Sequence, residues 1–161
     1  MVKKETLAIV SNASPLISLI QLNKLEILKR MYLNILISEE VYKEISHKEQ
    51  RECLQKEIRK AWIKKIKVPK LNVLHDLGIG EASSISLALQ YDKSLLIIDD
   101  LEARSFAKSI GLEVIGTVGV LLFAKEKKII DNLKNLLDKL QIKNLWLSNE
   151  LYKKILNLAG E

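Results

Sequence analysis

Cysteine is almost absent from this sequence, and proline and glycine are scarce. The one cysteine, Cys53, has no partner for an intramolecular disulfide and cannot by itself build a cysteine-based metal site, which favours an intracellular protein. With two prolines, six glycines and no low-complexity tract in 161 residues, the chain offers no obvious linker. We therefore expect one domain over residues 1–161 with a single hydrophobic core.

Long apolar runs are also missing. No stretch approaches the roughly 18 consecutive apolar residues of a membrane span. The apolar segment over residues 7–10 is too short for the hydrophobic region of a signal peptide. We expect a soluble cytoplasmic protein without membrane contact.

Acidic residues are outnumbered, with 20 against 26 lysines and arginines, a net charge of +6 and a pI near 9.3. The excess is concentrated between residues 48 and 70. A polyanion such as RNA would bind this charge with release of counterions. A solvated helix face explains the same run equally well. The candidate RNA contacts are Arg59, Lys60, Lys64 and Lys65 in this run, together with Ser14 nearer the N-terminus.

Short apolar segments alternate with helical patterns along the chain. Strands are expected at residues 7–11, 33–37, 62–68, 95–98 and 113–116, the third of them at a sheet edge. Helices are expected after Ser14, after Ser38, over 48–60, 81–91, 101–110, 117–125 and 129–140, and after Ser148 or Asn149. Ser14 is the expected N-cap of the first helix and Pro15 its first residue. This alternation indicates an α/β fold with a mostly parallel central sheet covered on both faces.

Residues 78–117 hold the pattern on which the functional hypothesis depends. A helix start at 78–81 contains Glu81, and the apolar run at 95–98 ends directly at Asp99 and Asp100. An apolar run that ends in two carboxylates places charge at the carboxyl edge of a parallel sheet, where open α/β sheets bind their ligands. We therefore look for a site at this edge.

Further polar residues are expected at the same edge. The first strand is usually central, so Asn12 at its end should lie beside the end of the strand at 95–98. Glu44, on an earlier helix, can face the same place. Clustered carboxylates repel one another unless a cation lies among them, and oxygen ligands without Cys or His select Mg²⁺ or Mn²⁺, which could activate water for phosphodiester hydrolysis. The candidate metal ligands are Asn12, Glu44, Glu81, Asp99 and Asp100.

Each of these residues also has a structural explanation. Asp100 could cap the helix that follows it, and Asp99 could be a solvated neighbour. Glu81 would be favoured in a first helical turn by the helix dipole alone. Glu44 could be an ordinary surface residue, and Asn12 suits a turn between a strand and a helix. Only their joint placement favours a functional site.

Several segments, taken in order, resemble a PIN domain. They are residues 9–17 (IVSNASPLI), 37–45 (ISEEVYKEI), 77–82 (LGIGEA), 96–104 (LIIDDLEAR) and 114–117 (VIGT). More narrowly, they resemble a prokaryotic PIN-like subfamily that starts with Asn/Asp-x-Ser-Pro-Leu-Ile and is related to VapC-type toxins. The resemblance implies a three-layer α/β/α fold and a Mg²⁺- or Mn²⁺-dependent ribonuclease. It also implies a frequent toxin–antitoxin context, with an antitoxin protein as partner.

The resemblance assigns catalytic roles to Glu44, Glu81 and Asp100, with Asp99 a possible substitute for Asp100. Ser14 falls where the family has a small polar residue near the metal, and Asn12 falls on the family's first aspartate. An amide can offer one carbonyl oxygen to a metal, but it removes a negative charge and cannot take a proton from water. The departure at Asn12 therefore bears directly on metal affinity and activity.

Competing functions follow from this departure. The leading hypothesis is a metal-dependent ribonuclease, and the alternative is a PIN-fold protein that binds nucleic acid or a partner without cleaving. A phospho-receiver is least favoured, because its acid pair would follow the first strand. The amphipathic pattern over residues 129–156 would serve an antitoxin interface, a homodimer or the monomer core equally well.

Overall fold

The computed structural model describes residues 6–69, 76–143 and 145–161. In these ranges five strands form one parallel sheet in the order β3-β2-β1-β4-β5. The strands are β1 (Ala8–Ser11), β2 (Ile35–Ser38), β3 (Ile63–Ile66), β4 (Ser94–Ile97) and β5 (Glu113–Ile115). The central position of β1 and the edge position of β3 confirm the predictions made from the sequence.

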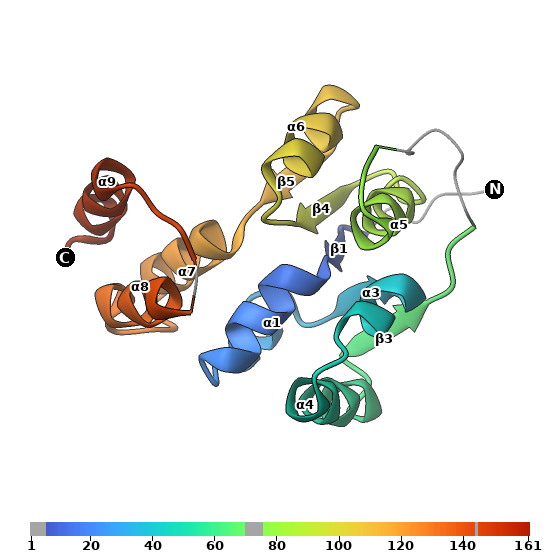
Figure 1. Ribbon diagram of the computed structural model, residues 1–161, viewed down its shortest axis with the longest axis horizontal. Coiled ribbons are helices and arrows are strands. Elements are labelled where there is room, and N and C mark those ends of the chain that lie inside the picture. Colours follow the sequence, from blue (N-terminus) through green and yellow to red (C-terminus); the bar gives the residue numbers. More distant parts are fainter. Residues whose placement is uncertain (1–5, 70–75, 144) are drawn as a thin grey trace.

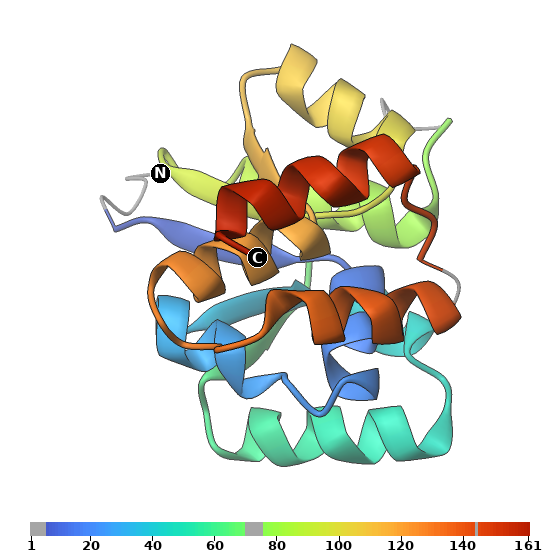
Figure 2. The ribbon, with the colours of Figure 1, turned by 90° about the vertical axis from the view of Figure 1, so that its left-hand side faces the viewer.

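Helices cover both faces of this sheet, which gives the predicted three-layer α/β/α arrangement. Figure 1 shows α5 and α6 on one side of the sheet and α1, α7 and α8 on the other, with α9 outermost. Figure 2, seen from that second side, shows α8 and α9 in front of the sheet. The helices are α1 (Ala13–Gln21), α2 (Glu26–Tyr32), α3 (Glu39–Glu44), α4 (Lys48–Arg59), α5 (Ile79–Ala88), α6 (Leu101–Ser109), α7 (Thr117–Glu126), α8 (Leu133–Ile142) and α9 (Asn149–Ala159). In the part of the chain that the structure describes, no helix is both long enough and apolar enough to span a bilayer.

The strands supply apolar side chains to both faces of the sheet. Ile9 and Ile97 belong to the core that lies with α1, α7 and α8, whereas Val10 and Leu96 belong to the core that lies with α5 and α6. Successive residues of a strand point to opposite faces, so each buried strand must be apolar throughout. This is why the strands read as continuous apolar runs in the sequence.

Most helices begin at the carboxyl edge of the sheet. The helices α1, α3 and α7 start within two residues of the ends of β1, β2 and β5, respectively, and α6 starts at Leu101, four residues after β4 ends at Ile97. The helix α5 leads into the amino end of β4, so its own first turn lies at the carboxyl edge as well. Polar residues at strand ends and in first helical turns are thereby collected at one edge.

The start of α1 differs from the prediction. The helix begins at Ala13 with Asn12 in the N-cap position, so Ser14 and Pro15 lie inside the first turn and Ser14 is not the cap. Proline fits the whole first turn, because the N–H groups there have no partner within the helix. Pro15 therefore indicated the first turn of the helix but not its first residue.

The start of α8 also differs from the prediction. The helix begins at Leu133, where Asn132 caps it by accepting from the N–H of Asn135 at 2.7 Å. Ile130, assigned from the sequence to the same helix, precedes it and is buried in the core. The apolar periodicity predicted one continuous helix because the residues before and after the turn pack against the same core.

Ser38 fixes the start of α3, the helix that ends at Glu44. The hydroxyl of Ser38 is fully buried, accepts from the N–H of Val41 at 3.0 Å and lies 2.7 Å from the hydroxyl of Ser83. We predict that Ser38→Ala lowers the free energy of unfolding by about 1–2 kcal/mol, as expected for loss of an N-cap. In thermal unfolding this corresponds to a fall in Tm of about 2–4 °C for each kcal/mol.

Ser148→Ala is the matched control. Ser148 caps α9 through the N–H of Leu151 at 3.2 Å, and no second side-chain bond of Ser148 was found in the described residues. Ser148→Ala should lower the free energy of unfolding by less than Ser38→Ala does. Equal losses of Tm in the two variants would contradict the role given to the bond between Ser38 and Ser83.

Candidate active site

Asn12 links the end of β1 to the first turn of α5. Its side chain is almost fully buried, and its backbone N–H donates to the carbonyl of Ile97 at 2.9 Å, which places it beside the end of β4 as predicted. Its Nδ2 donates to Oε1 of Glu81 at 3.1 Å, and its Oδ1 accepts from Oγ of Ser84 at 3.4 Å. Because an ionised carboxylate can only accept, the amide nitrogen must face Glu81.

Glu44 approaches the same turn from α3. Its Oε1 accepts from the N–H of Gly80 at 2.9 Å. Burial and then the negative charge of Glu81 raise the pKa of Glu44, while the bond from Gly80 acts in the opposite direction. The two carboxylates are therefore held close enough to repel each other.

Two glycines make room for these carboxylates. A Cβ on Gly80 would lie 2.3 Å from Oε2 of Glu44, and a Cβ on Gly78 would lie 2.1 Å from Oε2 of Glu81. Any side chain at either position would displace a carboxylate from its present place. In the sequence these glycines indicate only a helix start, although the Gly-x-Gly-Glu pattern is compatible with close packing by an acidic side chain.

Asp99 holds the start of α7. Its Oδ1 accepts from the N–H of Thr117 at 2.7 Å, and its Oδ2 accepts from the hydroxyl of Thr117 at 2.6 Å. Arg104 lies nearby, since a Cβ on Gly116 would be 2.8 Å from Nη1 of Arg104 and 3.0 Å from Oδ1 of Asp99. Neither Thr117 nor Arg104 was a candidate site residue from the sequence.

Asp100 caps α6. Its Oδ1 accepts from the N–H of Ala103 at 2.8 Å, so the structural explanation offered for Asp100 holds for that oxygen. The side chain is otherwise exposed to solvent. Its second oxygen, Oδ2, makes no hydrogen bond that we find within the described residues.

The structure groups only some of the predicted ligands. Asn12, Glu44 and Glu81 are connected by hydrogen bonds and charge, whereas Asp99 and Asp100, at the end of the adjacent strand, bond to the starts of α7 and α6. Across residues 6–69, 76–143 and 145–161, no three Asp, Glu, His or Cys side chains lie close enough to form a metal-binding group. Glu44 and Glu81 thus form a close pair, and the two further acids, Asp99 and Asp100, lie separately after the end of β4.

The predicted RNA contacts lie in different places. Ser14 is exposed in the first turn of α1, at the carboxyl edge. Arg59 and Lys60 end α4 just before β3 begins, so they lie at the amino edge, and Lys60 pairs with Glu57 at 2.8 Å. Lys64 and Lys65 are exposed on β3, and Nζ of Lys65 lies 4.4 Å from the ring centroid of Tyr42.

The raised pKa of Glu44 predicts a pH dependence of stability. A carboxyl whose pKa is higher in the folded than in the unfolded protein binds its proton more tightly when folded. Its contribution to stability therefore falls as the pH rises from the ordinary glutamate pKa of about 4.3 through the raised value. Glu44→Gln removes this titration and the repulsion with Glu81, yet keeps an acceptor for the N–H of Gly80.

We predict that Glu44→Gln, in EDTA, has a higher Tm than the wild type near neutral pH and that the gain shrinks toward about pH 4. Thermal unfolding over this pH range measures it. Glu102→Gln, at an exposed position in the first turn of α6, is the control and should leave the profile nearly unchanged. A loss of Tm in Glu44→Gln near neutral pH would contradict the repulsion.

Comparison with known proteins identifies the family of this chain. A family model described as a PIN domain matches residues 8–161, almost the whole chain, and PIN domains are generally nucleases that use divalent metal ions. No curated protein matches the chain. The parallel α/β/α fold and the family match together confirm the resemblance read from the sequence. This chain belongs to the PIN-domain family.

Proposed function

We propose that this protein is a Mg²⁺- or Mn²⁺-dependent ribonuclease whose reaction takes place at the carboxyl edge of the sheet. The observation that carries the proposal is the close pair of Glu44 and Glu81. Their repulsion contributes to the raised pKa of Glu44, and a divalent cation between them would relieve it. The PIN fold places this pair where open parallel sheets bind ligands.

The oxygen atoms available as ligands at this edge suit a hard cation. Glu44 and Glu81 supply carboxylate oxygens, and Oδ1 of Asn12 is an amide oxygen whose present partner, Ser84, is 3.4 Å away. Asp100 is not grouped with this pair in the described residues, but its Oδ2 has no hydrogen bond found there, and the family resemblance is the reason that we assign it to the ion and to the catalytic set. Asp99 has both oxygens bonded to Thr117, and we give it a positioning role.

In the proposed reaction, Glu44 and Asn12 have different roles. When bound, a divalent ion supplies Lewis acidity and lowers the pKa of water. Oε1 of Glu44 is occupied by the N–H of Gly80, so Oε2 is the atom that accepts a proton from the attacking water. The amide of Asn12 orients Glu81 through the bond to its Oε1.

RNA binding is supported by the net charge of +6 and by the exposed polar residues near this edge. In the proposal, Ser14 at the carboxyl edge and the exposed Lys64 and Lys65 of β3 contact the RNA. Arg59 and Lys60 lie at the opposite edge of the sheet, so only a longer RNA would reach them.

A role as the toxin of a toxin–antitoxin pair in the cytoplasm extends the proposal, and it rests on the family resemblance alone. Induced expression in a bacterial host tests it. The wild type should arrest growth, while Glu81→Gln, with the same shape but no negative charge, should not. Equal growth of both cultures would remove the toxin role and leave the ribonuclease proposal to be tested in vitro.

A metal-independent binding protein is the second candidate, and the bond from Asn12 to Glu81 favours it. That bond already provides a hydrogen-bond donor to one of the carboxylates, which partly satisfies the site without a cation. Binding of RNA that is unaffected by EDTA and not followed by cleavage would support this function over hydrolysis.

The decisive experiment is cleavage of a mixed-sequence single-stranded RNA in Mn²⁺. We predict that Glu81→Gln lowers the rate by at least about 100-fold, since loss of one metal ligand or acid–base group commonly costs that much. Asp100→Asn should lose a similar factor, whereas Asp99→Asn should lower the rate less and lower the Tm more, because it weakens the attachment of α7.

Glu102→Gln is the control for the loss of a negative charge near the edge and should cleave normally. Cleavage by Glu81→Gln at the wild-type rate would mean that the assigned site is wrong. Cleavage by wild type that persists in EDTA would mean that the metal dependence is wrong.

A further inference from the structure

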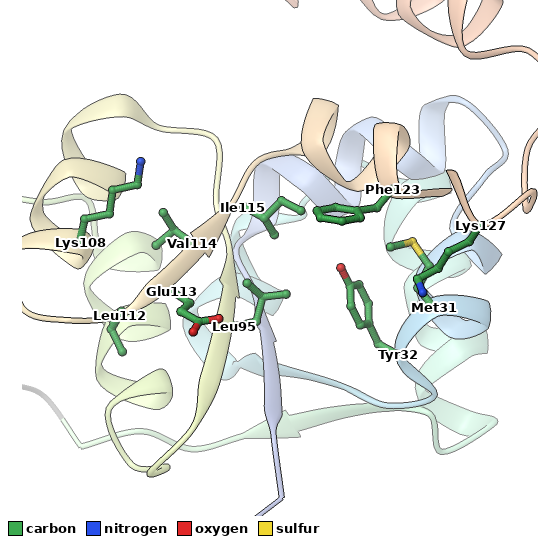
Figure 3. Close-up of a pocket in the computed structure, with 10 residues that line it drawn as sticks. All are labelled: Met31, Tyr32, Leu95, Lys108, Leu112, Glu113, Val114, Ile115, Phe123 and Lys127. Carbon is green, nitrogen blue, oxygen red and sulfur yellow. The ribbon is translucent and has the colours of Figure 1, made fainter. Parts of the chain in front are cut away.

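A cavity of about 560 Å³ lies at the end of the molecule opposite the acids. It is formed by the end of α2, the start of β4, the end of α6, the second half of α7 and the whole of β5. These ends all lie toward the amino edge of the sheet, so the cavity is separate from the candidate active site. Figure 3 draws its lining residues, among them Tyr32, Lys108, Val114, Ile115, Phe123 and Lys127.

The cavity lies against the edge of β5 and not over one face of the sheet. Val114 packs with the core beneath α5 and α6, whereas Ile115 packs with the core on the opposite face, yet both line the cavity. Figure 3 shows the two side chains on opposite sides of the strand. A cavity reached from both faces of a strand must pass around that strand's edge.

In the described residues, that edge carries backbone groups with no partner in the sheet. The strand β5 is last in the sheet order there, and β4 is its one neighbouring strand. The carbonyl of Ile115 points toward β4, because it accepts from the N–H of Ile98 at 2.8 Å. Peptide groups alternate in direction along a strand, so the N–H and C=O of Val114 face outward. An exposed edge of this kind is a template for pairing with another chain.

The surroundings of the edge are mostly apolar, and the charged residues that line the cavity are two lysines and one glutamate, Glu113. Lys108 and Lys127 flank the cavity, and neither has an ion pair in the described part of the chain. The hydroxyl of Tyr32 points into the cavity and has no hydrogen-bond partner among the described residues. The ring of Phe123 is 48% exposed. The edge thus offers apolar contacts, the N–H of Val114, the hydroxyl of Tyr32, and two lysines against the single carboxylate of Glu113.

We propose that β5 is a docking edge for an extended peptide segment of another protein, in which apolar and acidic side chains alternate. The peptide adds to the sheet through the N–H and C=O of Val114. Its apolar side chains enter the cavity between Tyr32 and Phe123, and its acidic side chains meet Lys108 and Lys127. This surface does not depend on the ribonuclease proposal, since it shares no residue with the acidic edge.

A peptide fits these observations better than a compact small molecule. A small apolar ligand would fill one side of the strand and leave the N–H and C=O of Val114 unpaired. A second strand pairs these groups and reaches both sides of β5 with alternate side chains. The two lysines then select the charge of the segment.

The test uses fluorescence anisotropy of a short labelled peptide of alternating valine and glutamate on the full chain. We expect Val114→Pro to weaken binding by roughly tenfold or more, because it removes the outward N–H, while the bonds from Ile115 to β4 remain. Val114→Thr keeps both the N–H and the shape and should bind as the wild type does. Methylation of the peptide's backbone nitrogens should weaken binding by a similar factor.

A charge swap covers the case in which Val114→Pro fails to fold. The double variant Lys108→Glu and Lys127→Glu should lose the valine–glutamate peptide and gain a valine–lysine peptide. Binding that is indifferent to backbone methylation would overturn strand addition in favour of a small-molecule pocket. No binding of the peptide, or self-association of the protein that Val114→Pro abolishes, would overturn the proposed partner, the latter in favour of a second copy of this chain.

Discussion

The repulsion between Glu44 and Glu81 is the constraint around which the carboxyl edge is built. Nothing in the chemistry of two carboxylates brings them together, so other contacts must do it. The N-cap at Ser38 sets the start of α3, the N–H of Gly80 holds the carboxylate of Glu44, and the amide of Asn12 holds that of Glu81. These contacts come from three segments far apart in sequence, and only the parallel sheet aligns them.

Asn12 shapes what this pair can do. An aspartate there would add a third negative charge beside Glu81, whereas the amide donates a hydrogen bond to it. In the proposed metal site, this bond stabilises the cation-free form and lowers the electrostatic gain from binding an ion. The proposal therefore makes Asn12 the residue that decides between hydrolysis and recognition.

Much of this arrangement could be predicted from the sequence, because local patterns determined it. Continuous apolar runs predicted a buried parallel sheet, and the Ser38 cap was visible from its position before two glutamates. The position of Asn12 beside β4 followed from the central place of the first strand. Both explanations of Asp100 were available, and the structure uses one of its oxygens as a cap.

Other features depend on contacts that no local pattern reveals. The bond from Gly80 to Glu44 joins residues 36 positions apart, and the bond from Thr117 to Asp99 crosses between strands. The basic run over residues 48–70 showed an excess of positive charge but not where that charge lies in the fold. In the structure, Arg59 and Lys60 lie at the amino edge, away from the acids. The exact first residue of α1 could not be predicted, because proline is equally acceptable throughout the first turn of a helix.

The central claim is that Glu44, Glu81 and Asn12 form a weak divalent-cation site whose empty state the Asn12 amide stabilises. Calorimetric titration of Mn²⁺ into the wild type and Asn12→Asp, with Tm recorded in EDTA, tests it most directly. The account predicts that Asn12→Asp binds Mn²⁺ roughly tenfold more tightly or better and melts at a lower temperature without metal. Equal Mn²⁺ affinity of the two proteins, or a higher Tm of Asn12→Asp in EDTA, would contradict it.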